Sequence, residues 1–424
     1  AELWAGGFTA PFTGTLALQR CQTTSVGVRV AVPRDALRGQ REVTMIAVDA
    51  VDGGAGGRIE LAARAPAPVL VVDGDFVADS EARYLEALDA LGVPYDAYEL
   101  GLGVSRPALP SASLLAQYPA LIWFTGYDFR PNGTLDVAGQ RLLAEYLDAG
   151  GRLLFASEDY LRSRAAVPFA DGRYFHRDYL GVAGFDDDGG GAQAGPLRGA
   201  PGSLMGGIEG CVPSYPGRDY SDLIQPRSEA DAVLLNRFDQ PVAVRLAMGR
   251  FRTVFLAMDG GLLDAACARE IHARVLDWFG PLADSTLRLV NAEGQPESRR
   301  TFAAGDTVHV ELTARTGGAR GVDAARIAWR IPPGATLDPA ALPSAWTWDE
   351  AARTLSWRGD ITAGRPARLR LALVLDADLP QETAMATSAE IVGDGLAARR
   401  EAAWRVNAPD LAGSTKTASP DDRP

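Results

Sequence analysis

The sequence has almost no lysine and an excess of acidic residues. Lys416 is the only lysine. The chain has 42 basic and 54 acidic residues, which gives a formal net charge of -12. Nucleic acids and anionic membrane surfaces bind proteins through a positive patch, so neither is expected as a partner. The sequence also lacks an apolar run of about 20 residues, the length that spans a bilayer, so membrane insertion is not expected.

Cysteine and histidine are scarce as well, with three residues of each. Cys21, Cys211 and Cys267 are too few for a disulfide framework and lack the spacing of a metal site. One pair at most can form a bridge, and Cys211 with Cys267 is the candidate. The sequence favours free thiols but leaves this pairing open, so cysteine content does not identify the compartment.

Between residues 68 and 280, short apolar runs alternate with helical patterns. Strands are predicted at 68–73, 95–100, 120–126, 152–157 and 252–259, and helices at 80–91, 135–149 and 265–279. Runs that are apolar throughout are typical of strands buried on both faces, which requires helices on both sides of the sheet. The predicted fold is a central α/β doubly wound parallel sheet of flavodoxin-like type.

On either side of this region, apolar and polar residues alternate, as in half-exposed strands. The N-terminal segment holds too few such strands for a complete β-sandwich, whereas the segment after the α/β region holds enough for an immunoglobulin-like one. We therefore expect a multidomain chain with a truncated β-sandwich over 1–66, an α/β domain over 67–281, an immunoglobulin-like sandwich over 282–408 and a tail over 409–424. The tail echoes residues 281–294 and is expected to begin a further repeat.

Several motifs, taken in order, resemble domains of large exported bacterial proteins. VRVAVP and EVTMIAVDA resemble the sandwich that follows the catalytic domain of secreted subtilisin-like peptidases. VLVVDGD, LIWFTGYDF and RLLFASEDYL resemble the class I glutamine amidotransferase-like domain, and FAAGDTVHVELTA and LSWRGDITAG are similar to a conserved-repeat sandwich of surface proteins. The resemblance implies an extracellular or cell-surface location, although AELWAGGFTA is no signal peptide, and partners among the parent protein's other domains or an extracellular polymer.

The chain departs from the amidotransferase pattern at the catalytic positions. The family has a Cys after the strand that corresponds to 152–156, and a His and a Glu after the strand that corresponds to 252–257. Here these places read FASEDY and FLAMDG. Glutamine hydrolysis needs a thiolate activated by an imidazole. The resemblance therefore implies a noncatalytic accessory or binding region, C-terminal to a peptidase domain that is not in this chain.

Ser157 lies where a strand is expected to end and a helix to begin, which suits an exposed nucleophile with His176 as its base. FASEDY, however, is not a G-x-S-x-G elbow, and a Ser followed by Glu158 and Asp159 is typical of a helix N-cap. We expect capping. A hydrolase that uses Ser157, with Glu158 or His176 assisting, is the alternative.

Five aspartates are expected where strands end, the place at which open α/β sheets bind ligands. They are Asp73, Asp75, Asp128, Asp159 and Asp259. If they converge, they offer a site for a divalent cation or a cationic ligand, and Asp73 with Asp75 is the pair most suited to a metal. Turn formation and helix capping are the commoner use of aspartate at such positions.

Asp186, Asp187 and Asp188 precede a run of glycines. Clustered carboxylates suit Ca²⁺, but the spacing of an EF-hand is missing, and a solvated loop is the simpler interpretation. The chain has no nucleotide-binding motif, so a nucleotide is not expected. No cofactor is expected, and Ca²⁺ is the alternative.

Trp346, Trp348 and Trp357 have the spacing of an aromatic platform for sugars, which makes a carbohydrate-binding surface module a further alternative. The same spacing is typical of a hairpin that packs its aromatic side chains into a sandwich core. We expect packing.

Glutaminase activity should be absent, because neither of the two catalytic positions carries the Cys or His that the reaction needs. Ammonia released from glutamine by the purified chain should equal that of the buffer blank. Release that is lost on Ser157→Ala would contradict this expectation.

Overall fold

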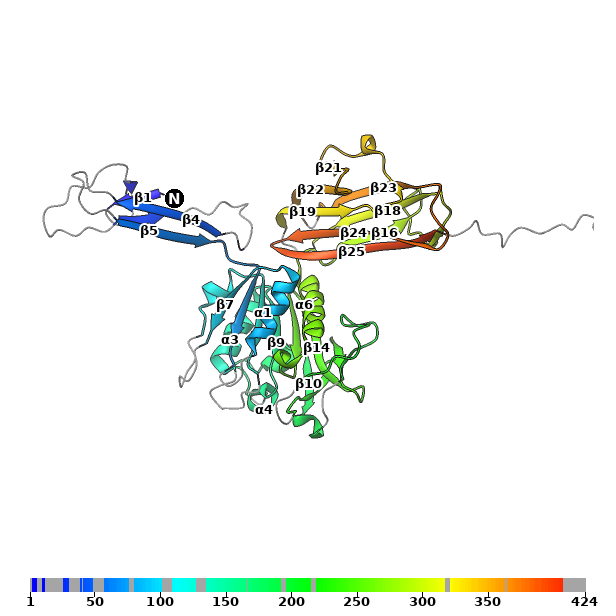
Figure 1. The fold of residues 1–424 in the computed structure, drawn as a ribbon. Helices are drawn as coiled ribbons and strands as arrows, with labels where there is room; N and C mark the ends of the chain where they lie inside the picture. The colour runs from blue at the N-terminus through cyan, green and yellow to red at the C-terminus, as the bar shows by residue number, and fades with distance from the viewer. Residues whose placement is uncertain are drawn as a thin grey trace, which may run out of the picture. The chain divides into compact units, whose positions relative to one another are not determined.

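The computed structural model describes residues 2–5, 10–11, 26–29, 39, 41–48, 57–75, 80–100, 109–126, 135–165, 167–191, 196–214, 219–316, 321–362 and 364–406 (Figure 1). The chain is mostly β-sheet with few helices. It divides into two compact units, Ala1–Arg269 and Glu270–Pro424. No helix within the described ranges is long and apolar enough to cross a membrane. The boundaries at 67, 282 and 409 stay predictions, and Cys21, Asp128 and the tail lie outside the described residues.

The N-terminal strands are antiparallel. β1 (Glu2–Ala5) pairs with β2 (Ala10–Pro11) and β3 (Val26–Arg29), and β4 (Arg41–Val48) pairs with β5 (Gly57–Arg64). The alternation of apolar and polar residues predicted strands in this part of the chain, and strands are present.

An eight-stranded sheet forms the centre of the first unit, in the order β11-β13-β14-β15-β9-β8-β6-β7. Its parallel strands are β6 (Val69–Asp73), β7 (Tyr95–Glu99), β8 (Ala120–Phe124), β9 (Arg152–Ala156) and β15 (Phe251–Leu256). Each pairs in parallel with its neighbour, and β6, β8 and β9 are buried almost throughout. These are the strands that the apolar runs predicted.

The sheet also has an antiparallel extension that the sequence did not reveal. β15 pairs with β14 (Pro241–Met248), which pairs with β13 (Ala230–Leu235), and β11 (Arg198–Gly199) completes the edge. The turn between β13 and β14 depends on Asn236, whose side-chain oxygen accepts hydrogen bonds from the N–H groups of Phe238 and Gln240. A separate ribbon pairs β10 (Val182–Asp186) with β12 (Leu223–Pro226). The segment over 181–227, which is rich in glycine, proline and aspartate, is therefore only partly irregular.

Helices pack on both faces of the parallel strands. The longer helices are α1 (Glu81–Leu91), α3 (Val137–Asp148) and α6 (Ala265–Phe279), and the shorter ones are α2 (Ala112–Leu115), α4 (Tyr160–Arg164), α5 (Phe175–Asp178), η1 (Asp187–Gly191) and η2 (Gly260–Leu262). Leu143 of α3 shares a core with Trp123, whereas Tyr84 of α1 stacks on Phe124 with ring centroids 4.2 Å apart. Trp123 and Phe124 are consecutive in β8 and point to opposite faces, so α1 and α3 cover opposite sides.

The second unit is a β-sandwich. Its strands are β16 (Thr286–Val290), β17 (Thr301–Phe302), β18 (Thr307–Ala314), β19 (Val322–Arg330), β20 (Ala335–Thr336), β21 (Trp346–Asp349), β22 (Thr354–Ile361), β23 (Ala367–Leu375), β24 (Thr383–Gly393) and β25 (Leu396–Val406), with η3 at Pro339–Ala341. One sheet has the order β16-β18-β23-β20 and the other β17-β25-β24-β19-β22-β21. Alternate residues of both sheets bury into one apolar core, as the period-2 pattern predicted.

Trp329 carries a buried polar group in this core. Its indole N–H donates to the Thr387 hydroxyl at 2.7 Å, and that hydroxyl donates to the Arg330 carbonyl at 2.7 Å. Trp329 and Thr387 are both fully buried. The threonine therefore satisfies a donor that would otherwise have no acceptor.

Replacing this hydroxyl should destabilise the sandwich. Thr387→Val keeps the shape of the side chain but leaves the indole N–H unpaired, which costs about 1–3 kcal/mol of the free energy of unfolding. Urea denaturation followed by tryptophan fluorescence measures the change. Ser388→Ala, at an exposed position of the same strand, should have little effect, and an equal loss in both variants would contradict the assignment.

Candidate functional site

The acidic side chains predicted to bind a ligand follow the ends of the parallel strands. β6, β8, β9 and β15 run in one direction, so their carboxyl ends meet at one edge of the sheet. Backbone hydrogen bonds between neighbouring strands continue past these ends. The N–H of Thr125 donates to the Ala156 carbonyl at 3.1 Å, and the N–H of Ser157 donates to the Leu256 carbonyl at 3.0 Å. The residues after each strand are therefore held by the backbone of the neighbouring strand.

Ser80 hydrogen-bonds to two of the carboxylates that were predicted to bind a ligand. Its N–H donates to Asp75 Oδ2 at 3.0 Å, and its hydroxyl donates to Asp259 Oδ2 at 2.7 Å. Gly126, with φ of +55°, lies against both, because an added Cβ would come within 3.3 Å of Asp75 Cβ and 3.6 Å of Asp259 Oδ2. Glycine is therefore favoured here by its backbone angle and by the close approach. The sequence identified both carboxylates, but Ser80 only as a helix start.

Glu158 is buried among other acids. It is 1% exposed, and its Oε1 atom has no hydrogen-bond partner. Burial, together with the negative charges of Asp259, Asp219, Asp159 and Asp222, raises the pKa of its carboxyl to about 9. None of these contributions comes from a basic side chain.

Two further acids of this region show the same effect. Burial and, to a smaller extent, the charge of Asp73 raise the pKa of Asp75 to about 7. Burial also raises the pKa of Asp259. We call the group the acidic edge, and it consists of Asp75, Glu158, Asp159, Asp219, Asp222 and Asp259, all less than a tenth exposed. The edge concentrates negative charge in a region of low solvent access, so it favours protons or a bound cation.

Asp73 and Asp75 lie together at the end of β6. The Asp75 N–H donates to Asp73 Oδ1 at 3.0 Å, and carboxylate oxygens of Asp73, Asp75 and Glu81 lie within 4.8 Å of one another. The predicted pairing of Asp73 with Asp75 is therefore observed as a contact. Its use by a metal stays a prediction.

Ser157 is fully buried, and its Oγ accepts hydrogen bonds from the Thr125 hydroxyl at 2.7 Å and the Tyr160 N–H at 3.1 Å. The second bond holds the first residue of α4, but the N-cap position of that helix is Asp159, so Ser157 is not the N-cap that the sequence predicted. His176 lies on α5, where burial and the Arg177 charge lower its pKa to about 4. Within the described ranges, no histidine hydrogen-bonds to Ser157. The structure therefore does not join the candidate base to the candidate nucleophile.

The three consecutive acids that were proposed to bind Ca²⁺ separate in the structure. Asp186 ends β10 and is exposed, whereas Asp187 and Asp188 begin η1. The carboxylate that joins the latter two is Asp222, with an oxygen within 4.8 Å of theirs. Sequence inspection missed Asp222 because it approaches through the pairing of β10 with β12, and no motif surrounds it.

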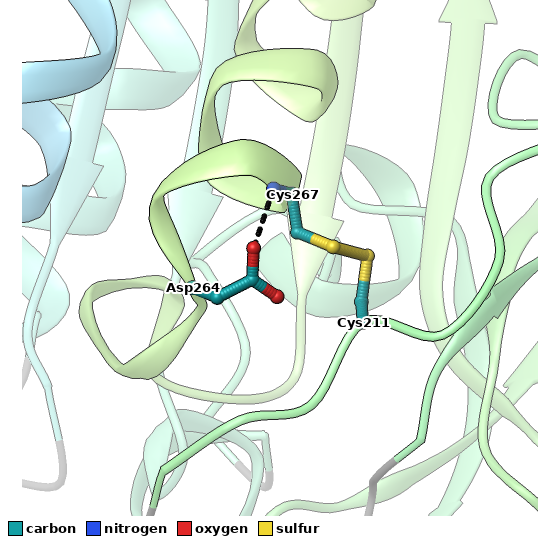
Figure 2. The surroundings of a disulfide bond; sticks show 3 residues. All are labelled: Cys211, Asp264 and Cys267. Atoms are coloured by element: carbon teal, nitrogen blue, oxygen red, sulfur yellow. Dashed lines mark hydrogen bonds between the residues drawn. A yellow bond between two sulfur atoms is a disulfide. The ribbon is translucent and has the colours of Figure 1, made fainter.

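Cys211 and Cys267 form a disulfide bond (Figure 2). The bond ties the irregular segment before β12 to the first turn of α6, where Asp264 Oδ1 accepts a hydrogen bond from the Cys267 N–H at 2.9 Å. The expectation of free thiols was wrong, because 56 residues separate the two cysteines and only the fold brings them together. Their sulfur atoms are consumed in the bond and offer no thiolate to a metal.

The tryptophans do not form a platform. Trp346 is 8% exposed and belongs to the sandwich core, and Trp348 and Trp357 pack against that core. The rings of Trp346 and Trp357 are tilted by 34°, with centroids 6.2 Å apart. The carbohydrate-binding alternative required coplanar exposed indoles, so the geometry does not support it.

No family model and no curated protein matches this chain. Solved structures with some likeness include the exo-beta-1,4-mannosidase Op5Man5 from Opitutaceae bacterium strain TAV5, at 14% identity and a TM-score of 0.29, covering 50% of this chain and 35% of that chain. The bacterial hydrophobin BslA has 18% identity and a TM-score of 0.22 over 30% of this chain and 96% of its own. A collagen-binding domain from a Staphylococcus aureus adhesin has 10% identity and a TM-score of 0.20 over 28% and 95%. Scores this low identify neither a family nor a function.

The acidic edge should make stability depend on pH. The pKa of Glu158 is about 9 in the folded protein against 4.5 for the free side chain, so between these values the folded state binds more protons than the unfolded state. The free energy of unfolding should therefore fall as the pH rises from about 5 to about 9, by at most about 1.4 kcal/mol per pH unit for one proton. Denaturant unfolding across this range measures the slope.

Glu158→Gln removes this titration and should flatten the slope. Glu145→Gln, at an exposed position of α3, makes the same chemical change and serves as the control. A wild-type stability that rises with pH in this window, or equal slopes in all three proteins, would contradict the assignment.

Proposed function

We propose that this chain is a noncatalytic binding region of an exported multidomain bacterial protein, and that its α/β unit binds a cation at the acidic edge. The unit would be flavodoxin-like and a degenerate amidotransferase-like domain, and the second unit an immunoglobulin-like sandwich. The strand order β7-β6-β8-β9-β15, with α1 and α3 on opposite faces, supports the flavodoxin-like assignment. The sequence motifs support the amidotransferase-like assignment and a position C-terminal to a subtilisin-like peptidase domain.

The observation that carries the proposal is the environment of Glu158. A carboxylate that is 1% exposed, has an oxygen without a hydrogen-bond donor and lies among acids is costly to ionise. A cation would satisfy that oxygen and offset the repulsion from Asp259 and Asp159. The carboxyl ends of parallel strands are also the usual ligand-binding edge of an open α/β sheet.

The environment of Ser157 supports the noncatalytic part of the proposal, and the disulfide bond supports export. The Ser157 hydroxyl accepts bonds from Thr125 and Tyr160 in the interior, and no described histidine hydrogen-bonds to it. The disulfide between Cys211 and Cys267 supports export, because such bonds form and persist mainly in oxidising compartments.

Calorimetric titration of the chelator-treated chain near neutral pH tests cation binding. CaCl₂, MgCl₂ and arginine methyl ester form separate arms, which distinguish a metal ion from an organic cation. At least one arm should show saturable binding, which Glu158→Gln weakens by about tenfold or more. Binding should also release protons, because a cation displaces the proton that the raised pKa of Glu158 retains. Repeating the titration in buffers of different ionisation enthalpy measures that release.

Glu145→Gln is again the matched control and should bind as the wild type does. The absence of saturable binding in all arms would overturn the proposal. So would binding that Glu158→Gln leaves unchanged.

A further inference from the structure

Asp187, Asp188 and Asp222 converge at one end of the β10–β12 ribbon. The register pairs Asp186 of β10 with Leu223 of β12, so the residues just beyond this pair lie side by side. Asp187 and Asp188 begin η1, and Asp222 directly precedes β12. One carboxylate oxygen from each lies within 4.8 Å of the other two.

Asp222 supplies a second observation that points to a ligand. Its side chain is 1% exposed, and its Oδ1 accepts a hydrogen bond from the Asp188 N–H at 3.1 Å. Its Oδ2 is buried and has no hydrogen-bond partner. Buried carboxylate oxygens are normally paired, so an additional positively charged group is expected beside Asp222.

The nearby guanidinium does not supply that group. Arg162 Nη1 lies 2.9 Å from Asp187 Oδ2 and 3.9 Å from Asp188 Oδ2, and the arginine side chain is 55% exposed. It forms no ion pair with Asp222 in the structure. Asp159 adds further negative charge near Asp222.

We propose that Asp187, Asp188 and Asp222 bind a calcium ion that fastens η1 to the start of β12. All three donors are carboxylate oxygens, which select a hard cation over zinc or copper. Two irregular segments supply the ligands. Calcium tolerates such variable geometry, whereas magnesium requires a near-ideal octahedron.

Titration of CaCl₂ into the full chain after chelator treatment tests the site. Asp187→Asn should weaken binding by about tenfold or more, and Asp222→Asn likewise. Asp186→Asn is the matched control, because Asp186 is adjacent, exposed and outside the cluster, and it should bind calcium as the wild type does. Arg162→Gln should tighten binding, because it removes a positive charge that competes for Asp187 and Asp188.

Hydrogen exchange provides a structural readout of the same site. Saturating calcium should slow exchange at residues 187–191 and 221–223 in the wild type, and it should not do so in Asp187→Asn. Asp187 is 42% exposed, so this variant should fold even if Asp222→Asn does not. The inference is overturned if calcium at up to millimolar concentration shows no saturable binding to the wild type. It is also overturned if Asp187→Asn binds calcium as the wild type does.

The inference goes beyond the proposed function. Asp222 belongs to both groups of acids, but the two proposals fail separately. Calcium binding that is lost in Glu158→Gln but kept in Asp187→Asn places the ion at the acidic edge, which supports the proposed function and overturns the site at η1. The opposite pattern supports the site at η1 alone.

Discussion

The burial of several carboxylates beside one another is the constraint that organises the first unit. The parallel strands end together, and the ladder that continues past them fixes Glu158 and Asp259 in a region of low solvent access. Water cannot stabilise these charges there, and no arginine contributes to the raised pKa of Glu158. Protons or a bound cation must supply the missing charge. Hydrogen bonds such as that from Ser80 to Asp259 offset only part of the cost.

The same burial is relevant to Ser157, which lacks the geometry of a hydrolase nucleophile. A nucleophilic serine needs a base within hydrogen-bond reach and an accessible hydroxyl. Ser157 instead accepts bonds from Thr125 and Tyr160 in the interior, and its neighbour Glu158 favours its protonated form near neutral pH. A protonated acid in that position is a poor base. The proposed chemistry of this edge is therefore the exchange of protons for a cation.

The sequence predicted the parallel strands and the acids that follow them because both signals are local. An apolar run identifies a buried strand, and the residue after it must lie at the sheet edge. Features that depend on distant pairing were not predictable in this way. Asp222 reaches Asp188 through the β10–β12 ribbon, and Cys211 reaches Cys267 across 56 residues. Charged residues, Asp231 and Arg245, interrupt the apolar runs of β13 and β14. Glu158 was visible as a residue, but its burial among Asp259, Asp219 and Asp159 was not.

The acidic edge and the cluster at η1 share a neighbour, which makes them electrostatically dependent. Asp222 belongs to the cluster and also contributes to the negative field at Glu158, as does Asp159. A cation at η1 would cancel part of that field and so weaken the attraction of the edge for a second cation. Thermodynamic linkage makes the effect reciprocal: a cation beside Glu158 must weaken binding at η1 by the same factor.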